Sequence, residues 1–455
     1  MNINETYGKE LPLWQLLSCR EERVSHQQAL FDKYSLPIIC FTLNIAGPVK
    51  RYSLADEAFD IGFEHILSVI SNKGFHIRHS EKVDRLSGCE GYMVIDAAPL
   101  EIKKIAAEIE EENPSFRLFD IDVIRVNGEK VSRSEIGKTD RHCLVCDEQA
   151  SVCARSRAHG LDVIIEKTHQ LLRNMVYNYR SHILADKAVK ALLDEVYTTP
   201  KPGLVDRNNN GSHSDMDVPL FEKSAFALRG YFHDISLMGQ NADICRGALS
   251  SLRELGKQAE KQMFEATNGI NTHKGAVFSM GIMCFCAGYI LGQGIKITAD
   301  LLHQVCKDVC CDVLDDFNEI NGKKNHTAGE DLYITNHIAG IRGEAHDGFP
   351  AVFYLALPFY EDIQRNGFSE NDAGCIVLLQ LIAQLEDTNV LKRGGMDGLM
   401  RCMTRAKRLL SVRLPLDELM DEIKRFDDEM INLNLSPGGC ADLLALTYFV
   451  HSIIE

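Results

Sequence analysis

Four polar residues of different chemistry, Asn271, Thr272, His273 and Lys274, stand directly before the apolar, helical-looking run 276–291. Asn and Thr often begin helices, because their side chains accept hydrogen bonds from free backbone N–H groups. A helix start also attracts anions, and here a histidine and a lysine could add a proton donor and a positive charge. The stretch is therefore either a helix cap or the place where an anionic ligand is held.

Polar islands of this kind recur through the second half of the chain, each with an acid, a base and a glycine at a predicted helix end. Any one of them is explained by capping and turn formation. Together they favour a site, because helical proteins build sites by bringing polar helix ends to one cavity. The candidate bases and metal ligands are Asp206, Asp215, Glu330, Asp331, Glu344 and Asp387; the candidate substrate-binding residues, besides the opening four, are Lys201, His213, Arg342, Asn389 and Arg393.

In the first half, Asp120 and Asp122 lie two residues apart in a strand-like segment, 118–126. Side chains at this spacing project from the same face of a strand, so the two carboxylates would lie close together. Such a pair suits a Mg²⁺ ion that also binds a nucleotide's phosphates. The alternative is the solvent-facing side of a half-exposed strand.

A second cluster follows, in which Cys143, Cys146, Cys153 and His159 offer the four ligands that zinc requires. Only six residues separate Cys146 from Cys153, which is shorter than in the common two-knuckle arrangement. The same stretch is rich in arginine, so the alternative is a set of buried thiols beside a phosphate-binding cluster. The sequence leaves both interpretations open.

The composition limits the class of protein. The chain has 455 residues, 25% charged and 45% hydrophobic, which is typical of a soluble globular protein with two or three domains. A formal net charge of −16 argues against a general nucleic-acid or anionic-membrane binder. We find no signal peptide or membrane-spanning stretch and expect a cytoplasmic protein, in which the 15 cysteines are reduced thiols.

The elements that would position these residues differ between the two halves. Helical and strand patterns alternate up to about residue 140, ending in an alternating run that meets Asn127-Gly128, a strong hairpin signal. Beyond about residue 160 only helical patterns remain. We predict two domains, an N-terminal α+β domain with a small mixed or antiparallel sheet and a C-terminal all-α helical bundle. Their boundary falls between about residues 160 and 185, within or beside a helix.

The stretches LLSCREERVSHQQ, LNIAGPVK, RLFDIDV, VSRSEIG and RHCLVC…CARSRAH resemble the apo-citrate lyase phosphoribosyl-dephospho-CoA transferase family over residues 10–175. The resemblance implies transfer of a prosthetic group to a serine of the citrate lyase acyl carrier protein, with release of pyrophosphate. It also implies that Asp120 and Asp122 hold Mg²⁺ and that Arg20, Arg23, Lys50 and Arg117 contact phosphates. One position departs from the pattern: Phe116 stands where we expect a glycine.

The stretches KPGLVD, GSHSDMD, GINTHKGAVFSMG, GIRGEA…GFP and DTNVLKRGG resemble the triphosphoribosyl-dephospho-CoA synthase family from about residue 185 onward. This implies that ATP and 3′-dephospho-CoA are joined and adenine is released. It also implies a Mg²⁺ requirement, with Glu330 and Asp331 as tentative ligands. We therefore expect a fusion of two consecutive enzymes: residues 1–175 as the transferase and residues 176–455 as the synthase.

Two alternatives remain from the residues alone. The helical part could be a metal-dependent hydrolase of nucleotides, in which case adenine release would need only water. The N-terminal part could be a zinc-stabilised module that binds the carrier protein without catalysing a transfer.

Overall fold

The computed structural model describes residues 8–146, 148–243, 245–315, 333–334 and 338–454. Contacts between Cα atoms divide the chain into two units, Met1–Tyr179 and Arg180–Glu455. The division falls inside α6 (Leu161–Tyr197), a long unbroken helix. Leu171, Leu172 and Val176 of this helix join the core of the first unit, and the core of the second unit begins at Leu184.

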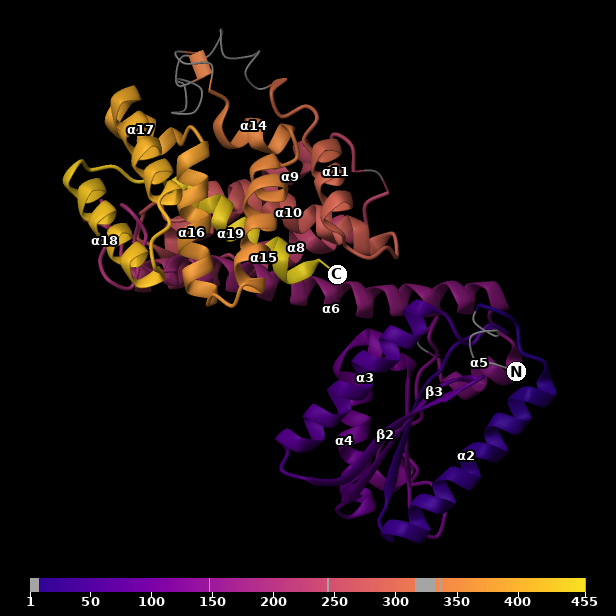
Figure 1. Ribbon diagram of the computed structural model, residues 1–455. Helices are drawn as coiled ribbons and strands as arrows, with labels where there is room; N and C mark the ends of the chain where they lie inside the picture. Colours follow the sequence, from indigo (N-terminus) through magenta and orange to yellow (C-terminus); the bar gives the residue numbers. More distant parts are fainter. Residues whose placement is uncertain (1–7, 147, 244, 316–332, 335–337, 455) are drawn as a thin grey trace. The chain divides into compact units, whose positions relative to one another are not determined.

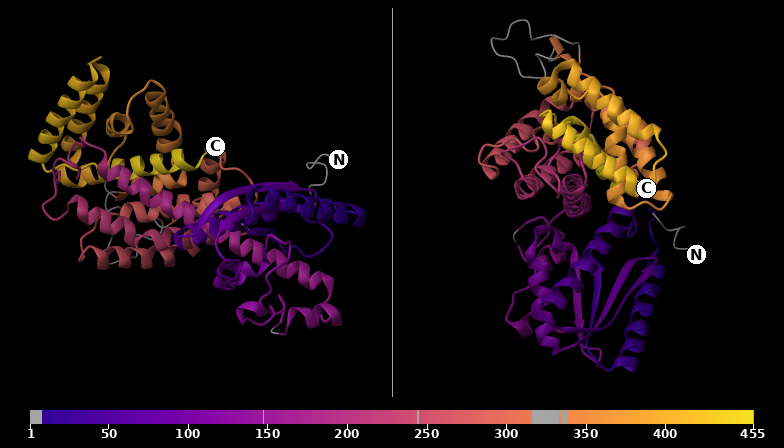
Figure 2. Two further views of the ribbon diagram at one scale, coloured as in Figure 1. Left: turned by 90° about the horizontal axis from the view of Figure 1, so that it is seen from below. Right: turned by 60° about the vertical axis from the view of Figure 1, so that its left-hand side comes forward.

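A four-stranded antiparallel sheet forms the centre of the first unit, with strand order β2-β3-β1-β4. Helices α3 and α4 contribute the apolar residues that cover one face, and α2 supplies Leu30 and Phe31 to the other (Figures 1 and 2). The elements are α2 (Leu13–Tyr34), β1 (Ile38–Leu43), α3 (Ser53–Asn72), β2 (His76–Arg85), β3 (Gly88–Asp96), α4 (Pro99–Glu112), the 3₁₀ turn η1 (Pro114–Leu118), β4 (Phe119–Ile124), the 3₁₀ turn η2 (Ser134–Ile136) and α5 (Ala150–Ser156).

The sheet, which we predicted to be mixed or antiparallel, is antiparallel. Its edge strand β2 was not predicted, because its sequence carries no strand pattern. Its residues alternate between exposed and half-buried, so it lacks the apolar side that marks a strand. The predicted turn at Asn127-Gly128 is present, with Gly128 in the left-handed region (φ 82°). Only an isolated bridge between Ile124 and Lys130 follows it, so the expected second hairpin strand does not form.

The described residues of the second unit form helices and loops. These helices are α7 (Val218–Ala227), α8 (Arg229–Gln240), α9 (Leu249–Ala266), α10 (Lys274–Gly292), α11 (Ala299–Val309), α14 (Gly340–His346), the π-helical segment η4 (Ala351–Ala356), α15 (Leu357–Arg365), α16 (Glu370–Gln384), α17 (Thr388–Ser411), α18 (Leu416–Asn432) and α19 (Gly438–Ile453). The C-terminal part is therefore the predicted helical assembly.

Helix α10 lies in the interior of this unit, in contact with α8, α9, α11 and α19 (Figure 1). Its backbone approaches that of α8 closely: a Cβ at Gly288 would lie 2.2 Å from the carbonyl oxygen of Ser236. By length and composition α10 could cross a membrane, and the bent pair α16–α17 passes the same test. However, 72% of the apolar window of α10 is buried in the unit, which is typical of a core helix in a soluble protein.

Candidate active sites

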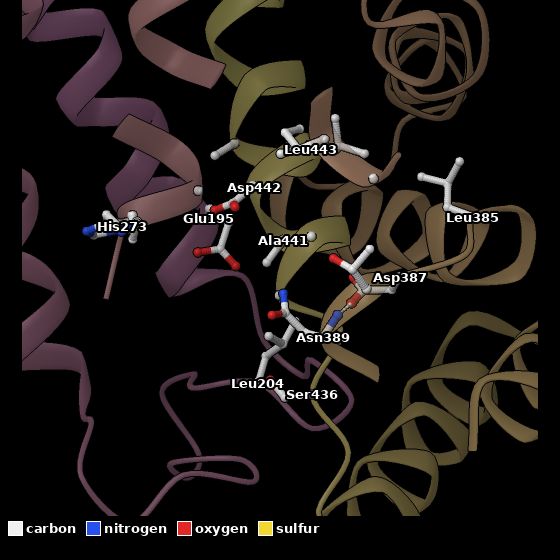
Figure 3. A pocket seen from close by; sticks show the side chains of 18 of the residues that line it. Glu195, Leu204, His273, Leu385, Asp387, Asn389, Ser436, Ala441, Asp442 and Leu443 are labelled. Atoms are coloured by element: carbon white, nitrogen blue, oxygen red, sulfur yellow. Dashed lines mark hydrogen bonds between the residues drawn. The ribbon is translucent and has the colours of Figure 1, made fainter. Parts of the chain in front are cut away.

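A cavity of about 850 Å³ in the second unit collects most of the predicted polar residues. The first residues of α10, α17 and α19 all line it, so the starts of three separate helices meet at one space. Figure 3 shows residues that line it. The predicted residues among the lining are Lys201, His213, Asn271, Thr272, His273, Lys274, Glu344, Asp387, Asn389 and Arg393.

A buried ion pair lies on one wall of the cavity. The ammonium group of Lys201, which is 1% exposed, pairs with the Glu195 carboxylate and donates to the Glu195 carbonyl oxygen at 2.7 Å. Burial raises the pKa of Glu195, while the positive charge of Lys201 opposes that shift. Lys201 is thus already neutralised by a neighbour, and an incoming phosphate would compete with Glu195 for it.

Asp442, in the first turns of α19, lies beside Glu195 and faces the cavity (Figure 3). Burial raises its pKa well above the ordinary value, and the charges of Glu195 and Asp387 raise it further. Within the described part of the chain, no hydrogen bond or ion pair holds this carboxylate. The Asp442 carboxylate has room here because Gly275 has no side chain: a Cβ at position 275 would lie 1.9 Å from Asp442 Oδ2.

Asp387 organises two of the helix starts at once. Its Oδ1 accepts hydrogen bonds from the backbone N–H groups of Asn389 (2.8 Å) and Val390 (3.1 Å), which caps α17. Its Oδ2 accepts from the N–H of Cys440 (2.9 Å) at the start of α19. Burial raises the pKa of Asp387, and these N–H groups counteract the rise. This predicted base or ligand is committed to the helix ends.

The opening quartet combines capping with a hydrogen-bonded chain. Asn271 Oδ1 accepts from the Lys274 N–H at 3.2 Å, so Asn271 supplies the cap. The Thr272 hydroxyl instead donates to Ser224 Oγ at 2.7 Å, and Ser224 Oγ lies 2.8 Å from His273 Nδ1. If the Ser224 hydroxyl donates its hydrogen bond to Nδ1, then Nδ1 is the acceptor and Nε2 carries the imidazole hydrogen. Nε2 is buried without a partner among the described residues.

The environment of His273 does not suit the proposed proton donor. Burial, with a smaller contribution from the charge of Lys201, lowers its pKa to about 3. The imidazole is therefore neutral near neutral pH, which argues against a role for His273 as a proton donor. It can still offer a neutral N–H hydrogen bond.

The other basic residues that line the cavity, Arg393, His213 and Lys274, are less buried than Lys201. Arg393 donates to the carbonyl oxygen of Ser212 at 2.9 Å and lies 3.3 Å from Nδ1 of His213. Burial, helped by the nearby Arg393 charge, lowers the pKa of His213. The ammonium group of Lys274 is 2.9 Å from Glu260, and its side chain is 53% exposed. A partly exposed pair of this kind contributes little to stability and can open for a ligand.

Several predicted residues do not line this cavity. Asp206 is buried and accepts hydrogen bonds from the N–H groups of Lys201 (2.9 Å) and Asn208 (2.7 Å), so it orders a loop. Asp215 is exposed beyond His213. Arg342 lies on α14, whose Gly343 and Glu344 reach the cavity. Glu330 and Asp331 lie outside the described residues.

A separate cavity of about 440 Å³ in the first unit brings together Arg20 and Arg23 of α2, Lys50 and Asp120 of β4. Burial lowers the pKa of Lys50, and the nearby positive charge of Arg20 lowers it further. Burial raises the pKa of Asp120, and the negative charge of Asp122 adds to the rise. The repulsion between Lys50 and Arg20 would be relieved by a phosphate, and the crowding of Asp120 by Asp122 would be relieved by a divalent cation.

The other residues predicted for this site differ in position. Asp122 follows Asp120 along the same face of β4, but it pairs with Lys130 and does not line the cavity. Arg117 lines a different cavity and donates to the carbonyl oxygen of Cys143 at 2.8 Å. Phe116 packs its ring on Phe119, with 4.4 Å between ring centres, and its φ is not positive. The backbone at this position therefore does not require glycine.

The predicted Cys/His cluster forms in the first unit. The ligand atoms of Cys143, Cys146, Cys153 and His159 all lie within 4.8 Å of one another, so the cluster could hold a metal ion. Loop 143–146, helix α5 and the segment before α6 supply them.

Known proteins are similar to this chain over nearly its whole length. Residues 12–175 match the family of apo-citrate lyase phosphoribosyl-dephospho-CoA transferases, and residues 181–455 match the ATP:dephospho-CoA triphosphoribosyl transferases. Protein CitXG of Haemophilus influenzae is 36% identical over 98% of this chain and 97% of its own length. Protein CitXG of Leuconostoc mesenteroides is 33% identical, with 98% of each chain covered. This chain belongs to the CitXG family.

The second part has relatives of its own within this assignment. A 2-(5''-triphosphoribosyl)-3'-dephosphocoenzyme-A synthase of Haemophilus ducreyi is 39% identical over 68% of this chain and 99% of its own length. The predicted resemblance to the two families is thus confirmed, and so is the prediction that the chain is a transferase, because both matched families are transferases.

Glu195 and Asp442 of this CitXG-family chain were not predicted from the sequence. Glu195 is one of many charged residues in the amphipathic helix α6, and Asp442 comes shortly after two glycines at the start of the last helix. Neither lies in a polar island. The signal that could have found Asp442 is its place at the beginning of an otherwise almost wholly apolar helix. Burying a charged side chain among apolar residues is costly, so such a residue is a candidate for a functional role.

Proposed function

We propose that this chain makes and attaches the prosthetic group of citrate lyase in two consecutive steps. The second unit joins ATP to 3′-dephospho-CoA, giving 2′-(5″-triphosphoribosyl)-3′-dephospho-CoA and adenine. The first unit transfers this product to a serine of the citrate lyase acyl carrier protein and releases pyrophosphate. Family membership and the convergence of helix starts, cations and carboxylates on one cavity support the proposal. We place both steps in the cytoplasm.

In the second unit, a carboxylate must take the proton of the dephospho-CoA 2′-hydroxyl while its oxygen attacks the anomeric carbon of the ATP ribose. Asp442 is the best candidate, because it faces the cavity, is not used elsewhere in the described structure and has a raised pKa. A raised pKa makes the ionised carboxylate a stronger base toward a hydroxyl. Asp387 is excluded from this role by its commitment to two helix ends.

The triphosphate needs positive partners that stay in place while the glycosidic bond breaks. Lys274 at the start of α10 and Arg393 on α17 supply them. Glu344, whose pKa burial raises, is a candidate to give a proton to the departing adenine. His273 would contribute a neutral hydrogen bond.

In the first unit, Arg20, Arg23 and Lys50 would neutralise the phosphates as a serine hydroxyl attacks the α-phosphorus. Asp120 fits a Mg²⁺ ion, since burial and Asp122 disfavour its charge and a divalent cation would relieve both. Asp122 could join it by leaving Lys130. When bound, Mg²⁺ would balance the charge that develops on the leaving pyrophosphate.

The deciding experiment is mass spectrometry of purified apo-acyl carrier protein after incubation with this chain, ATP, Mg²⁺ and dephospho-CoA. We expect a mass increase equal to the phosphoribosyl-dephospho-CoA group and release of adenine only when dephospho-CoA is present. Adenine release with ATP and water alone would favour a hydrolase. Carrier protein that binds but is never modified would favour a binding module.

A further inference from the structure

The Cys/His cluster is the strongest feature of the first unit that the proposed reaction leaves unused. Cys143 and Cys153 are buried, and Cys146 Sγ lies 3.5 Å from Cys153 Sγ and 3.2 Å from His159 Nε2. In a tetrahedral zinc site, bond lengths of about 2.3 Å to sulfur and 2.0 Å to nitrogen place ligand atoms roughly 3.6 to 3.8 Å apart. These two separations are close to that range, and the four ligand atoms all lie within 4.8 Å of one another, so a metal ion would need to draw them together only slightly.

The backbone of the loop also has the form of a metal-binding knuckle. The Cys143 N–H donates to the Glu148 carbonyl oxygen at 2.6 Å, and His142 and Gln149 form a β-bridge. The Val145 N–H points to Cys143 Sγ at 3.4 Å, which would stabilise a thiolate there. The loop thus presents Cys143 and Cys146 in one direction, toward Cys153 on α5.

The alternatives from the sequence fit less well. All of these cysteines are free thiols, and 3.5 Å between Cys146 and Cys153 sulfurs is far longer than a disulfide bond of about 2.05 Å. Arg141 pairs with the buried Glu110 and donates to the Phe119 carbonyl oxygen at 2.7 Å, so it is already engaged within the protein. A phosphate-binding arginine cluster would need this residue to be available.

We propose that Cys143, Cys146, Cys153 and His159 bind one Zn²⁺ ion as a closed structural site. Four protein ligands leave no open position for a water or substrate, so the ion would stabilise the fold instead of reacting. It would tie the loop and α5 to the start of α6. Binding displaces the thiol protons, because zinc takes thiolate ligands.

The position of this site links it to the proposed transferase cavity, and this second step rests on the proposed function. Arg117 donates to the Cys143 carbonyl oxygen, and Arg141 of the same loop donates to Phe119, the residue before Asp120. A fixed loop therefore supports the beginning of β4, which carries the candidate Mg²⁺ ligand. Loss of zinc should weaken the first unit's activity and leave the second unit's activity intact.

The test is elemental analysis of the full-length chain, purified without a metal-affinity tag and dialysed against a weak chelator. We expect about one zinc per chain, and at least roughly tenfold weaker zinc binding in Cys146→Ser and Cys153→Ser. Cys311→Ser, an exposed thiol outside the cluster, is the matched control and should keep its zinc. Absence of zinc in the wild type, or zinc unchanged in both cluster variants, would overturn the proposal.

A cobalt-substituted wild-type chain keeps the test decisive if the serine variants fail to fold. Thiolate ligation in a tetrahedral site gives a sulfur-to-cobalt charge-transfer band and intense visible bands, whereas ligation by oxygen alone gives neither. Absence of these bands in a folded chain that has taken up cobalt contradicts the assignment. If the chain binds one zinc ion but does not modify the carrier protein, the zinc site is supported and only the proposed function is contradicted.

Discussion

Replacing Gly275 with alanine should disable the second unit without unfolding it. A Cβ at this position would lie 1.9 Å from Asp442 Oδ2. Non-bonded heavy atoms normally stay roughly 3.4 Å or more apart, so the carboxylate would have to move by about 1.5 Å. The nearest atoms to the new methyl group belong to this one side chain, which borders an open cavity and can turn away.

The two expected effects differ greatly in size. Alanine is favoured over glycine inside helices by at most about 1 kcal/mol, and turning one side chain costs a similar amount, so the free energy of unfolding should change by less than about 1 kcal/mol. Catalysis depends more steeply on position, since a misplacement of about 1 Å can cost about 100-fold in rate, or about 2.7 kcal/mol. We expect kcat/KM for adenine release to fall by about this factor.

The assay is steady-state adenine release beside thermal melting without ligand. Gly256→Ala on α9 is the control, because its Cβ would first meet Tyr231 Oη at 3.9 Å, an ordinary contact. Gly256→Ala should keep full activity. The double variant of Gly275→Ala with Asp442→Ala should be no slower than Asp442→Ala alone, since both changes act through one carboxylate. Normal kinetics in Gly275→Ala, or losses that simply add, would refute the role given to Asp442.

Further variants address the other residues. Asp120→Asn should slow carrier-protein modification by about 100-fold, Asp122→Asn should slow it less, and neither should change adenine release; equal rates of modification would leave both as a solvated strand face. Lys274→Met should weaken use of ATP by at least about 10-fold with an unchanged melting temperature in the absence of ATP. Asp387→Ala should lower the free energy of unfolding by about 2 to 4 kcal/mol, measured by urea denaturation. Because the pKa of His273 is lowered to about 3 from 6.5, its contribution to stability is present above pH 6.5 and lost as the pH falls toward 3; acid unfolding of His273→Leu should therefore depend less steeply on pH than that of the wild type.

The sequence predicted the parts of the fold that carry a strong local pattern. Strand β4 lies within the strand-like segment 118–126, and helix α10 covers the apolar run 276–291. Strand β2 has no such pattern, because it lies at the sheet edge with neither face fully buried.

For the site, polar residues at helix ends were a good guide to the cavity, but they did not separate roles. Asp206 and Asp387 have the same chemistry as a catalytic base, and only their hydrogen bonds show that each is used to hold backbone N–H groups. Glu195 was missed because it is one of many charged residues in the amphipathic helix α6, and Asp442 because it lies within the apolar helix α19 and outside the polar islands. Their closeness depends on tertiary packing, which a single sequence does not record.

The double attachment of Asp387 bears on how such a cavity could change during evolution. One carboxylate fixes the starts of both α17 and α19, and α19 carries Asp442. A substitution that moved one helix start to admit a different substrate would also displace the other and the candidate base with it. A change of substrate specificity in the wall formed by α17 and α19 should therefore require paired substitutions, each deleterious alone. By contrast, the side formed by Lys274 and its partly exposed partner Glu260 can vary one residue at a time.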